Sequence, residues 1–388
     1  MKIAIVHEWL DGYAGSERVL EQLFEVFPQA DLFAVCDFLP DHERGFLGGR
    51  VPRTSFIQRL PRARAWFRYY LGLMPIAVEQ FDLSGYDLVL SSSHAVAKGV
   101  LTGPATLHVS YVHSPMRYAW DLQHQYLRQS RMDTGVKGLL TRWLLARMRA
   151  WDHASAARPD VILANSAWIA ERIRKAWRRE SLVVHPPVDL DGFPFKAGKG
   201  AAYVVASRLV PYKRIDLIAE AFRQMPDRQL IIAGDGPEMA RVRMAAADAP
   251  NIRILGRVPQ AELVALLADA RAFVFAAEED FGIGMVEAQA CGTPLIAFAR
   301  GGAADIVQPD VTGVLFPEQS AEGIVGAVTR FESLLISPEA CRANAERFSQ
   351  AAFRDRILSV VREAGAARGM PESWMPEPWM AAPWMPAP

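Results

Sequence analysis

The sequence predicts an α/β protein made of two consecutive doubly wound, Rossmann-like domains. Short apolar runs alternate with helical patterns from the first residue, and the same alternation restarts after a break rich in proline and glycine near residue 186. The chain has 388 residues, too many for one ordinary core but enough for two. We therefore expect two parallel sheets whose carboxyl edges face each other across an interdomain cleft.

The first half contains five apolar runs with the length of buried strands. They lie at residues 2–9, 31–38, 86–94, 107–115 and 159–166. A helix with apolar residues at a spacing of three to four is expected over 16–27. Each run ends in small or polar residues, which can supply ligand contacts at the carboxyl edge of a parallel sheet.

The second half contains six further apolar runs. They lie at residues 201–209, 229–236, 252–258, 272–278, 293–299 and 312–318. Helical stretches separate them, so the second half also predicts alternating strands and helices.

These patterns set the expected domain boundaries. Residues 1–185 and 201–345 should form the two domains, with residues 186–200 as a linker. A C-terminal helix over 346–364 is expected to return to the first domain. Residues 365–388 are rich in Pro, Trp and Met and predict a flexible tail, with a membrane or partner contact as its alternative role.

Composition excludes several classes of function. The 43 basic and 43 acidic residues cancel, so no overall field favours nucleic acid. Three scattered cysteines suggest neither a disulfide framework nor a zinc cluster. No signal peptide and no run of about 18 apolar residues is present. We expect a cytoplasmic protein, either free or peripheral on the inner face of the membrane.

Two cations and a glycine turn in the second half suit a diphosphate. Arg208 follows an expected strand and Lys213 opens an expected helix, so both can converge near the start of that helix. Gly234-Asp235-Gly236 follows the next strand and allows close approach of the backbone. Taken alone, basic residues at a helix start are more often simply solvated, and a Gly-Asp-Gly sequence is more often an ordinary turn.

Two glutamates flank a glycine-containing bend in "AAEEDFGIGMVEAQACG". If a strand ends near Glu279 and a helix begins after the bend Phe281–Gly284, the free amides of the bend face the crevice. A carboxylate accepts hydrogen bonds from vicinal hydroxyls, so Glu287 on the first helical turn suits a ribose and Glu279 suits a sugar. The alternative is a charge effect at the helix start.

The order Arg208, Lys213, Gly234-Asp235-Gly236 and Glu279-x7-Glu287 resembles the nucleotide-sugar domain of retaining glycosyltransferases of family 4, which have the GT-B fold. The resemblance extends over most of residues 1 to about 360. It implies an acceptor-binding first domain and a donor-binding second domain. It also implies that Arg208 and Lys213 neutralise the leaving diphosphate, so that neither a metal nor another cofactor is required. The triplet Asp189–Asp191 is interpreted as part of the linker and not as a metal site.

The resemblance also assigns residues to roles. The catalytic candidates are His113, Arg208, Lys213 and Glu279. The donor-binding candidates are Gly15, Gly234, Arg257, Val258, Phe281, Gly282, Ile283 and Glu287. The acceptor-binding candidates are Arg117, Tyr118 and Asp121, which follow His113 on one predicted surface.

The motif "HSPMRYAWD" at residues 113–121 resembles a segment of the mannosyltransferases of bacterial polysaccharide assembly. This implies transfer of mannose from GDP-mannose to a glycan acceptor, which such enzymes commonly find on a polyprenyl diphosphate. A UDP-sugar donor, a nucleotide-sugar epimerase and a noncatalytic binding protein are the alternatives. No G-x-S-x-G elbow and no full dinucleotide fingerprint is present, which disfavours hydrolases and dehydrogenases.

Arginines and aromatic residues are interleaved over residues 56–75. Arg59, Arg62, Arg64 and Arg68 stand beside Trp66, Phe67, Tyr69 and Tyr70. This mixture suits an anionic bilayer surface. The alternative is that the arginine stems cover ordinary core helices.

Overall fold

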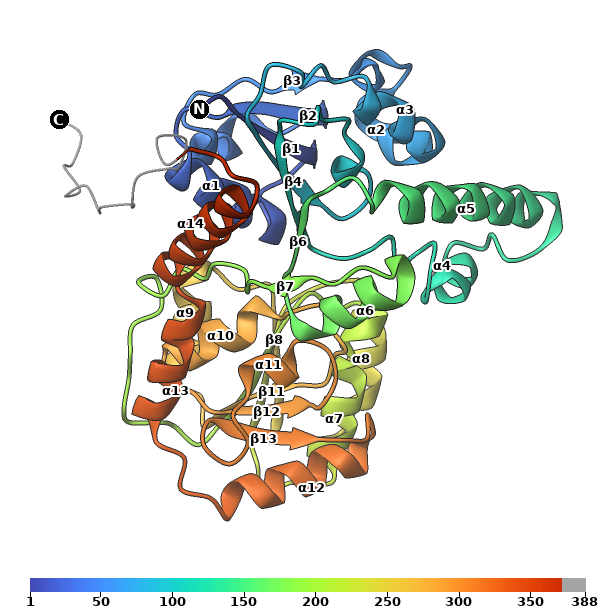
Figure 1. Cartoon of the computed structure of the whole chain (residues 1–388). Coiled ribbons are helices and arrows are strands. Elements are labelled where there is room, and N and C mark those ends of the chain that lie inside the picture. The colour runs from blue at the N-terminus through green and yellow to red at the C-terminus, as the bar shows by residue number, and fades with distance from the viewer. Residues whose placement is uncertain (372–388) are drawn as a thin grey trace. The chain divides into compact units, whose positions relative to one another are not determined.

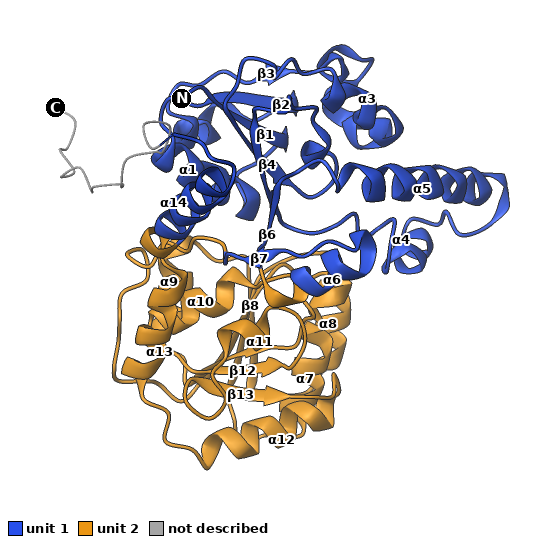
Figure 2. Ribbon diagram, viewed as in Figure 1, with its two compact units in different colours: residues 1–165, 169–185, 353–388 blue, residues 166–168, 186–352 orange. Residues whose placement is uncertain are grey.

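The computed structural model describes residues 1–371, which form two compact units (Figures 1 and 2). Unit 1 contains residues 1–165, 169–185 and, within the described part of the chain, 353–371. Unit 2 contains residues 166–168 and 186–352. The tryptophans of the expected tail, Trp374, Trp379 and Trp384, lie outside the described residues.

Unit 1 is built on a seven-stranded parallel sheet with the order β3-β2-β1-β4-β5-β6-β7. Its strands are β1 (Ile3–Leu10), β2 (Asp31–Asp37), β3 (Arg53–Thr54), β4 (Leu88–Ser93), β5 (Leu107–Val112), β6 (Val161–Ala164) and β7 (Leu182–Val183). The five expected strands are present. The two-residue edge strands β3 and β7 are too short to give a sequence signal.

Helices complete unit 1. They are α1 (Gly15–Val26), α2 (Ala63–Trp66), α3 (Met74–Glu79), α4 (Gln123–Gln129), α5 (Gly135–Ser155), α6 (Ala167–Trp177) and α14 (Gln350–Ala367), with 3-10 turns η1 (Asp41–Glu43), η2 (Gly45–Leu47), η3 (Phe56–Arg59), η4 (Phe67–Leu73) and η5 (Ala97–Gly99). At the start of α1 the Ala14 amide donates to Glu17 Oε2 at 2.9 Å, which satisfies one of the free backbone donors of the helix end.

Unit 2 is built on a six-stranded parallel sheet with the order β10-β9-β8-β11-β12-β13. Its strands are β8 (Tyr203–Ala206), β9 (Leu230–Ala233), β10 (Ile252–Gly256), β11 (Ala272–Phe275), β12 (Leu295–Phe298) and β13 (Gly313–Phe316). Its helices are α7 (Ile215–Arg223), α8 (Met239–Ala245), α9 (Gln260–Asp269), α10 (Ile283–Ala290), α11 (Ala303–Ile306), α12 (Ala321–Glu332) and α13 (Pro338–Ala345), with η6 (Pro211–Lys213) and η7 (Glu346–Phe348). The predicted α/β class with two doubly wound sheets is confirmed.

The segment expected as a linker packs on unit 2. Leu190 and Phe193 are buried in its core, and Arg342 Nη1 donates to the Phe193 carbonyl at 3.1 Å. Residues 186–200 therefore lack helix but are part of unit 2.

The C-terminal helix α14 packs on unit 1, and it begins later and ends later than the expected 346–364. Helix α14 lies beside α1 (Figure 1). Phe353 and Ile357 enter the unit 1 core, and Arg354 Nη1 donates to Gln22 Oε1 of α1 at 2.5 Å. Arg368 pairs with Asp160 at 2.5 Å. The first residues of the expected tail are therefore ordered parts of unit 1.

A fully buried ion pair joins α5 to the turn η5. Lys98 Nζ lies 2.5 Å from Asp152 Oδ1, and both side chains are at most 1% exposed. The second carboxylate oxygen of Asp152 accepts from Trp120 Nε1 and Trp177 Nε1, each at 2.7 Å. Asp152 therefore neutralises a buried ammonium and satisfies two indole groups.

We expect Asp152→Ala to lower the free energy of unfolding of unit 1 by about 3–5 kcal/mol, because it leaves the Lys98 charge buried without a counterion. Urea denaturation measures the loss. The control is Lys196→Met, which removes an exposed pair with Asp269 (2.6 Å) and should cost about 0–1 kcal/mol. Equal, small losses in the two variants would contradict the structural role of Asp152.

Candidate functional site

The predicted donor residues of unit 2 follow four neighbouring strands. Arg208 follows β8, Gly234 follows β9, Arg257 and Val258 follow β10, and Glu279 follows β11. Because these strands are parallel, their carboxyl ends lie at one edge of the sheet. The topology therefore gathers residues from a span of about 70 positions along that edge.

The glycine turn after β9 packs against the segment that carries Arg208. The Leu209 amide donates to the Asp235 carbonyl at 2.9 Å, and the Gly234 amide donates to the Gly256 carbonyl at 2.7 Å. Gly234 has φ of 137°, and a Cβ there would collide with the Ser207 carbonyl oxygen. The close approach that requires glycine is to the chain itself, and it fixes the Arg208 loop beside the β10 loop. Approach of a ligand to this turn stays a prediction.

Lys213 does not open a helix as expected: it ends the turn η6 and lies two residues before the first residue of α7, because Arg214 (φ 51°) separates the two elements. Its ammonium forms an ion pair with Glu279 Oε1 and lies 5.4 Å from the centroid of the Phe275 ring. The sequence assigned these two side chains to different parts of a donor, and the structure brings them together. Arg208 is exposed, and its guanidinium makes no hydrogen bond or ion pair with another residue of 1–371.

The bend after β11 is set by Gly282, which has φ of 99° and caps α10. The helix begins at Ile283, so Glu287 lies on its second turn and not on the first as expected. Phe281 is buried and its ring lies 5.6 Å from that of Phe348. Its side chain belongs to the core, so Phe281 can offer a ligand only backbone groups.

A glycine pair after β12 completes this edge, and the sequence analysis missed it. The Gly302 amide donates to the Glu279 carbonyl at 2.9 Å. A Cβ at Gly301 would collide with the Glu279 carbonyl oxygen, and one at Gly302 with the Phe281 carbonyl oxygen. The signal available in the sequence was two adjacent glycines directly after a strand, in "ARGGA".

A chain of buried polar side chains leads to His113 in unit 1. Glu17 Oε1 lies 3.2 Å from His7 Nε2, His7 Nδ1 lies 3.1 Å from Ser92 Oγ, and Ser92 Oγ lies 2.9 Å from His113 Nε2. Glu17 belongs to α1, which begins at the predicted donor residue Gly15. The sequence analysis singled out Gly15 and His113 but not Glu17, His7 and Ser92.

His113 is neutral at physiological pH. Burial, with help from the neighbouring His94 and His7, lowers its pKa to about 3. A neutral imidazole can exchange hydrogen bonds with a sugar hydroxyl but adds no positive charge. His113 is therefore suited to positioning rather than to neutralising a diphosphate.

Glu8 shapes the loop next to this chain. Its carboxylate accepts from the backbone amides of residues 94–97 at 2.7–3.0 Å and from the Ser93 hydroxyl at 3.0 Å. Burial raises the pKa of Glu8, but His94 and the amides lower it, and the net shift is below its ordinary value. Glu8 is thus a buried carboxylate that holds a loop at the carboxyl end of β4.

The three predicted acceptor residues follow β5 but lie in different surroundings. Tyr118 packs against the unit 1 core, where burial raises its pKa. Asp121 is half exposed and pairs with Arg172 at 3.1 Å. Arg117 is partly buried. Contact of these residues with an acceptor stays a prediction.

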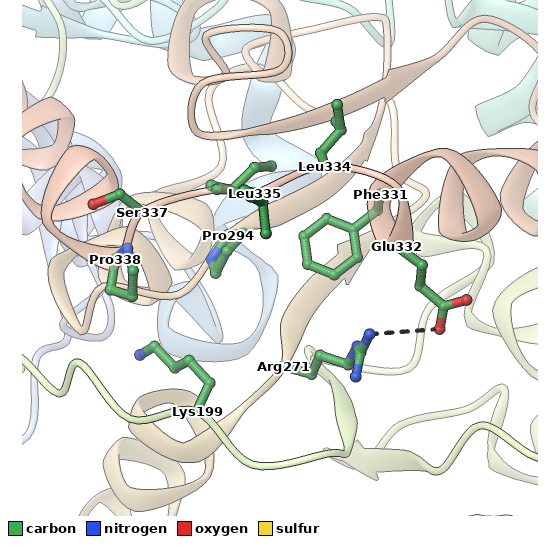
Figure 3. Close-up of a pocket in the computed structure, with 10 residues that line it drawn as sticks. Lys199, Arg271, Pro294, Phe331, Glu332, Leu334, Leu335, Ser337 and Pro338 are labelled. Atoms are coloured by element: carbon green, nitrogen blue, oxygen red, sulfur yellow. Dashed lines mark ion pairs between the residues drawn. The ribbon is translucent and has the colours of Figure 1, made fainter.

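A pocket of about 390 Å³ lies at the opposite edge of the unit 2 sheet (Figure 3). Its lining includes Lys199, Arg271 and Pro294, which precede β8, β11 and β12. Lys199 Nζ already donates to the Cys291 carbonyl at 2.8 Å and to Thr293 Oγ1 at 3.0 Å. None of the predicted donor residues lines this pocket.

Residues 1–371 contain no group of three or more His, Cys, Asp or Glu arranged to hold a metal ion. The acidic triplet at 189–191 forms a turn in which Asp189 Oδ1 accepts from the Asp191 amide at 3.1 Å.

Parts of the chain are similar to known proteins. Residues 190–348 match the family model described as "Glycosyl transferases group 1". A GDP-mannose-dependent monoacylated alpha-(1-6)-phosphatidylinositol monomannoside mannosyltransferase of Corynebacterium glutamicum is 38% identical over 122 residues, 28% of this chain and 32% of that protein. A GDP-mannose-dependent alpha-(1-6)-phosphatidylinositol monomannoside mannosyltransferase of Mycolicibacterium smegmatis is 29% identical over 198 residues, 44% of this chain and 52% of that protein. These matches span between about a third and a half of the relatives.

Solved structures match both units. Sucrose-phosphate synthase from Thermosynechococcus elongatus aligns with a TM-score of 0.67 at 18% identity, covering 95% of this chain and 100% of that one. The lipopolysaccharide outer core galactosyltransferase WaaB aligns with a TM-score of 0.63 at 17% identity, also covering 95% and 100%. Anabaena HepE in complex with UDP-glucose aligns with a TM-score of 0.63 at 17% identity, covering 93% and 99%. These matches identify the fold as GT-B.

Proposed function

We propose that the chain is a retaining glycosyltransferase. The proposal starts from the match of residues 190–348 to the family model described as "Glycosyl transferases group 1" and from the GT-B fold. One observation carries the proposal. The cations Arg208 and Lys213 and the carboxylates Glu279 and Glu287 belong to loops and a helix start at one edge of the unit 2 sheet. This set offers positive charge for a diphosphate and acceptors for sugar hydroxyls.

The chemistry needs stabilisation of the leaving group. As the bond from the anomeric carbon to the diphosphate oxygen breaks, negative charge develops on the nucleoside diphosphate. Arg208, which is exposed, and Lys213, which is held beside Glu279, would neutralise this charge without a metal. The acceptor oxygen would bond to the same face of the sugar, and its proton would pass to the departing diphosphate oxygen.

We further propose GDP-mannose as the donor and a lipid-linked glycan as the acceptor. The support is the motif at residues 113–121 and the similarity to two relatives whose names specify GDP-mannose and a phosphatidylinositol mannoside. Neutral His113 would position the transferred hexose. The hydrogen bonds that run from Glu17 through His7 and Ser92 would hold the His113 imidazole in place.

A thermal-shift panel of GDP-, UDP- and ADP-sugars tests the donor assignment. We expect GDP-mannose to raise the melting temperature by on the order of a few degrees at saturating concentration, because a ligand that binds only the folded state stabilises it. GDP-glucose and UDP-glucose are the matched controls for sugar and base. A larger shift with UDP-sugars would replace the GDP assignment. In a separate assay with donor alone, inversion of the sugar would favour an epimerase.

A further inference from the structure

Helix α5 of unit 1 exposes a row of large apolar side chains. Val136, Leu139, Leu140 and Trp143 are 74%, 68%, 60% and 60% exposed. Their spacing places all four on one face of the first half of the helix, which we call the α5 face. Single exposed apolar residues are common on protein surfaces, but a contiguous apolar patch usually marks an interaction site.

The α5 face is not the side by which the helix packs on unit 1. Leu145, Met148 and Asp152 are buried, and the pair between Asp152 and Lys98 anchors the second half. The first half projects from the body of unit 1 (Figure 1). No helix within residues 1–371 is long and apolar enough to cross a membrane.

The segment that contains the α5 face and the segment next to it are rich in basic residues. Residues 56–78 and 123–151 together contain ten Lys or Arg and one acid, Asp133, although the whole chain is balanced at 43 of each sign. The two segments are adjacent, because a Cβ at Gly72 would lie 3.0 Å from Leu144 Cδ1. The Arg147 guanidinium lies 5.6 Å from the centroid of the Trp143 ring.

The predicted arginines belong to these basic segments. Arg59, Arg62, Arg64 and Arg68 are all exposed. Arg62 lies over the Trp66 ring at 4.9 Å, and Arg68 pairs with Asp11 at 2.5 Å. Three of the four therefore carry charge without an ion pair to another described residue.

We propose that the α5 face docks unit 1 on an anionic lipid bilayer. The apolar row would enter the boundary between headgroups and acyl chains, and the basic side chains would contact anionic headgroups. Trp143 suits this depth because its ring is amphipathic. A second copy of the chain fits less well, since pairing two such faces would bring like charges together. The proposal rests on unit 1 alone and does not depend on the chemistry of unit 2.

Vesicle sedimentation of the full chain tests the apolar part. We expect wild-type protein to bind phosphatidylglycerol-containing vesicles at low salt and not vesicles of phosphatidylcholine alone. The triple variant Leu139→Ser, Leu140→Ser, Trp143→Ser should bind at least about tenfold more weakly, because it removes the inserted apolar area. The control replaces three exposed apolar residues of unit 2, Met244, Val311 and Leu335, by serine and should bind like wild type.

A second pair of variants tests the charge. Lys137→Gln with Arg147→Gln should weaken binding and reduce its salt dependence, whereas Arg243→Gln with Arg253→Gln should do neither, although all four residues are exposed. The nucleotide thermal shift should be unchanged in every variant, so failure of the donor assignment and failure of docking are distinguishable. Absence of wild-type binding to anionic vesicles, or equal binding by the triple variant, would overturn the proposal. A concentration-dependent dimer that the triple variant abolishes would replace the bilayer by a second copy.

Discussion

Lys213→Ala and Arg208→Ala are each expected to lower turnover by about a hundredfold or more, which corresponds to about 2.7 kcal/mol of transition-state stabilisation. Both cations belong to the loop after β8, and backbone hydrogen bonds to the Gly234 turn fix the Arg208 part of that loop. Removing either one leaves developing diphosphate charge without a positioned partner. Steady-state rates with GDP-mannose and a lipid extract as acceptor measure the effect.

The matched control is Arg330→Ala. Arg330 forms an exposed pair with Asp310 at 2.6 Å on α12, and its loss should leave turnover within about twofold, because exposed pairs contribute little. Conservative Lys213→Arg should recover part of the rate, since it retains the charge but changes the geometry. Near wild-type rates in both alanine variants would contradict the assignment of Arg208 and Lys213 to the diphosphate.

Glu279→Ala is expected to reduce kcat by on the order of a hundredfold, whereas Glu287→Ala is expected mainly to weaken donor binding. Glu279 is held by Lys213 and by the Gly302 amide on its carbonyl, next to the bend where the sugar would lie. Glu287 lies on the second turn of α10, where its carboxylate suits ribose hydroxyls. Calorimetric titration with GDP and rates at saturating donor separate the two effects.

The ion pair between Lys213 and Glu279 adds a sharper test. Because the two side chains touch, the double alanine variant should lose less than the sum of the single losses. Isosteric Glu279→Gln removes the charge but keeps the shape, and it should resemble Glu279→Ala if charge is what matters. Unchanged GDP affinity in Glu287→Ala would count against the ribose assignment.

The sequence predicted the strands and the loops that carry the donor residues because buried parallel strands leave continuous apolar runs. "LIIAGDG" and "FVFAAEED" each contain a strand followed by its functional loop. Placing Arg208, Gly234 and Glu279 at one edge required only that the strands be parallel. The resemblance to a known family then assigned roles that residue types alone left open.

Contacts that depend on the strand order could not be predicted in the same way. The approach of Gly301 to Glu279 requires β12 to lie beside β11, and the link from His7 to Ser92 requires β4 to lie beside β1. The α5 face was also hidden, because the sequence does not show which side of an apolar, basic helix packs on the core. Only the burial of Leu145 and Met148 fixes that side.

A crystal structure of the protein with GDP tests the central claim most directly. The account predicts the diphosphate within hydrogen-bonding distance of Arg208 and Lys213 and the ribose hydroxyls on Glu287, at the carboxyl edge of the unit 2 sheet. A diphosphate bound elsewhere, for example in the pocket beside Lys199 at the opposite edge, would contradict it.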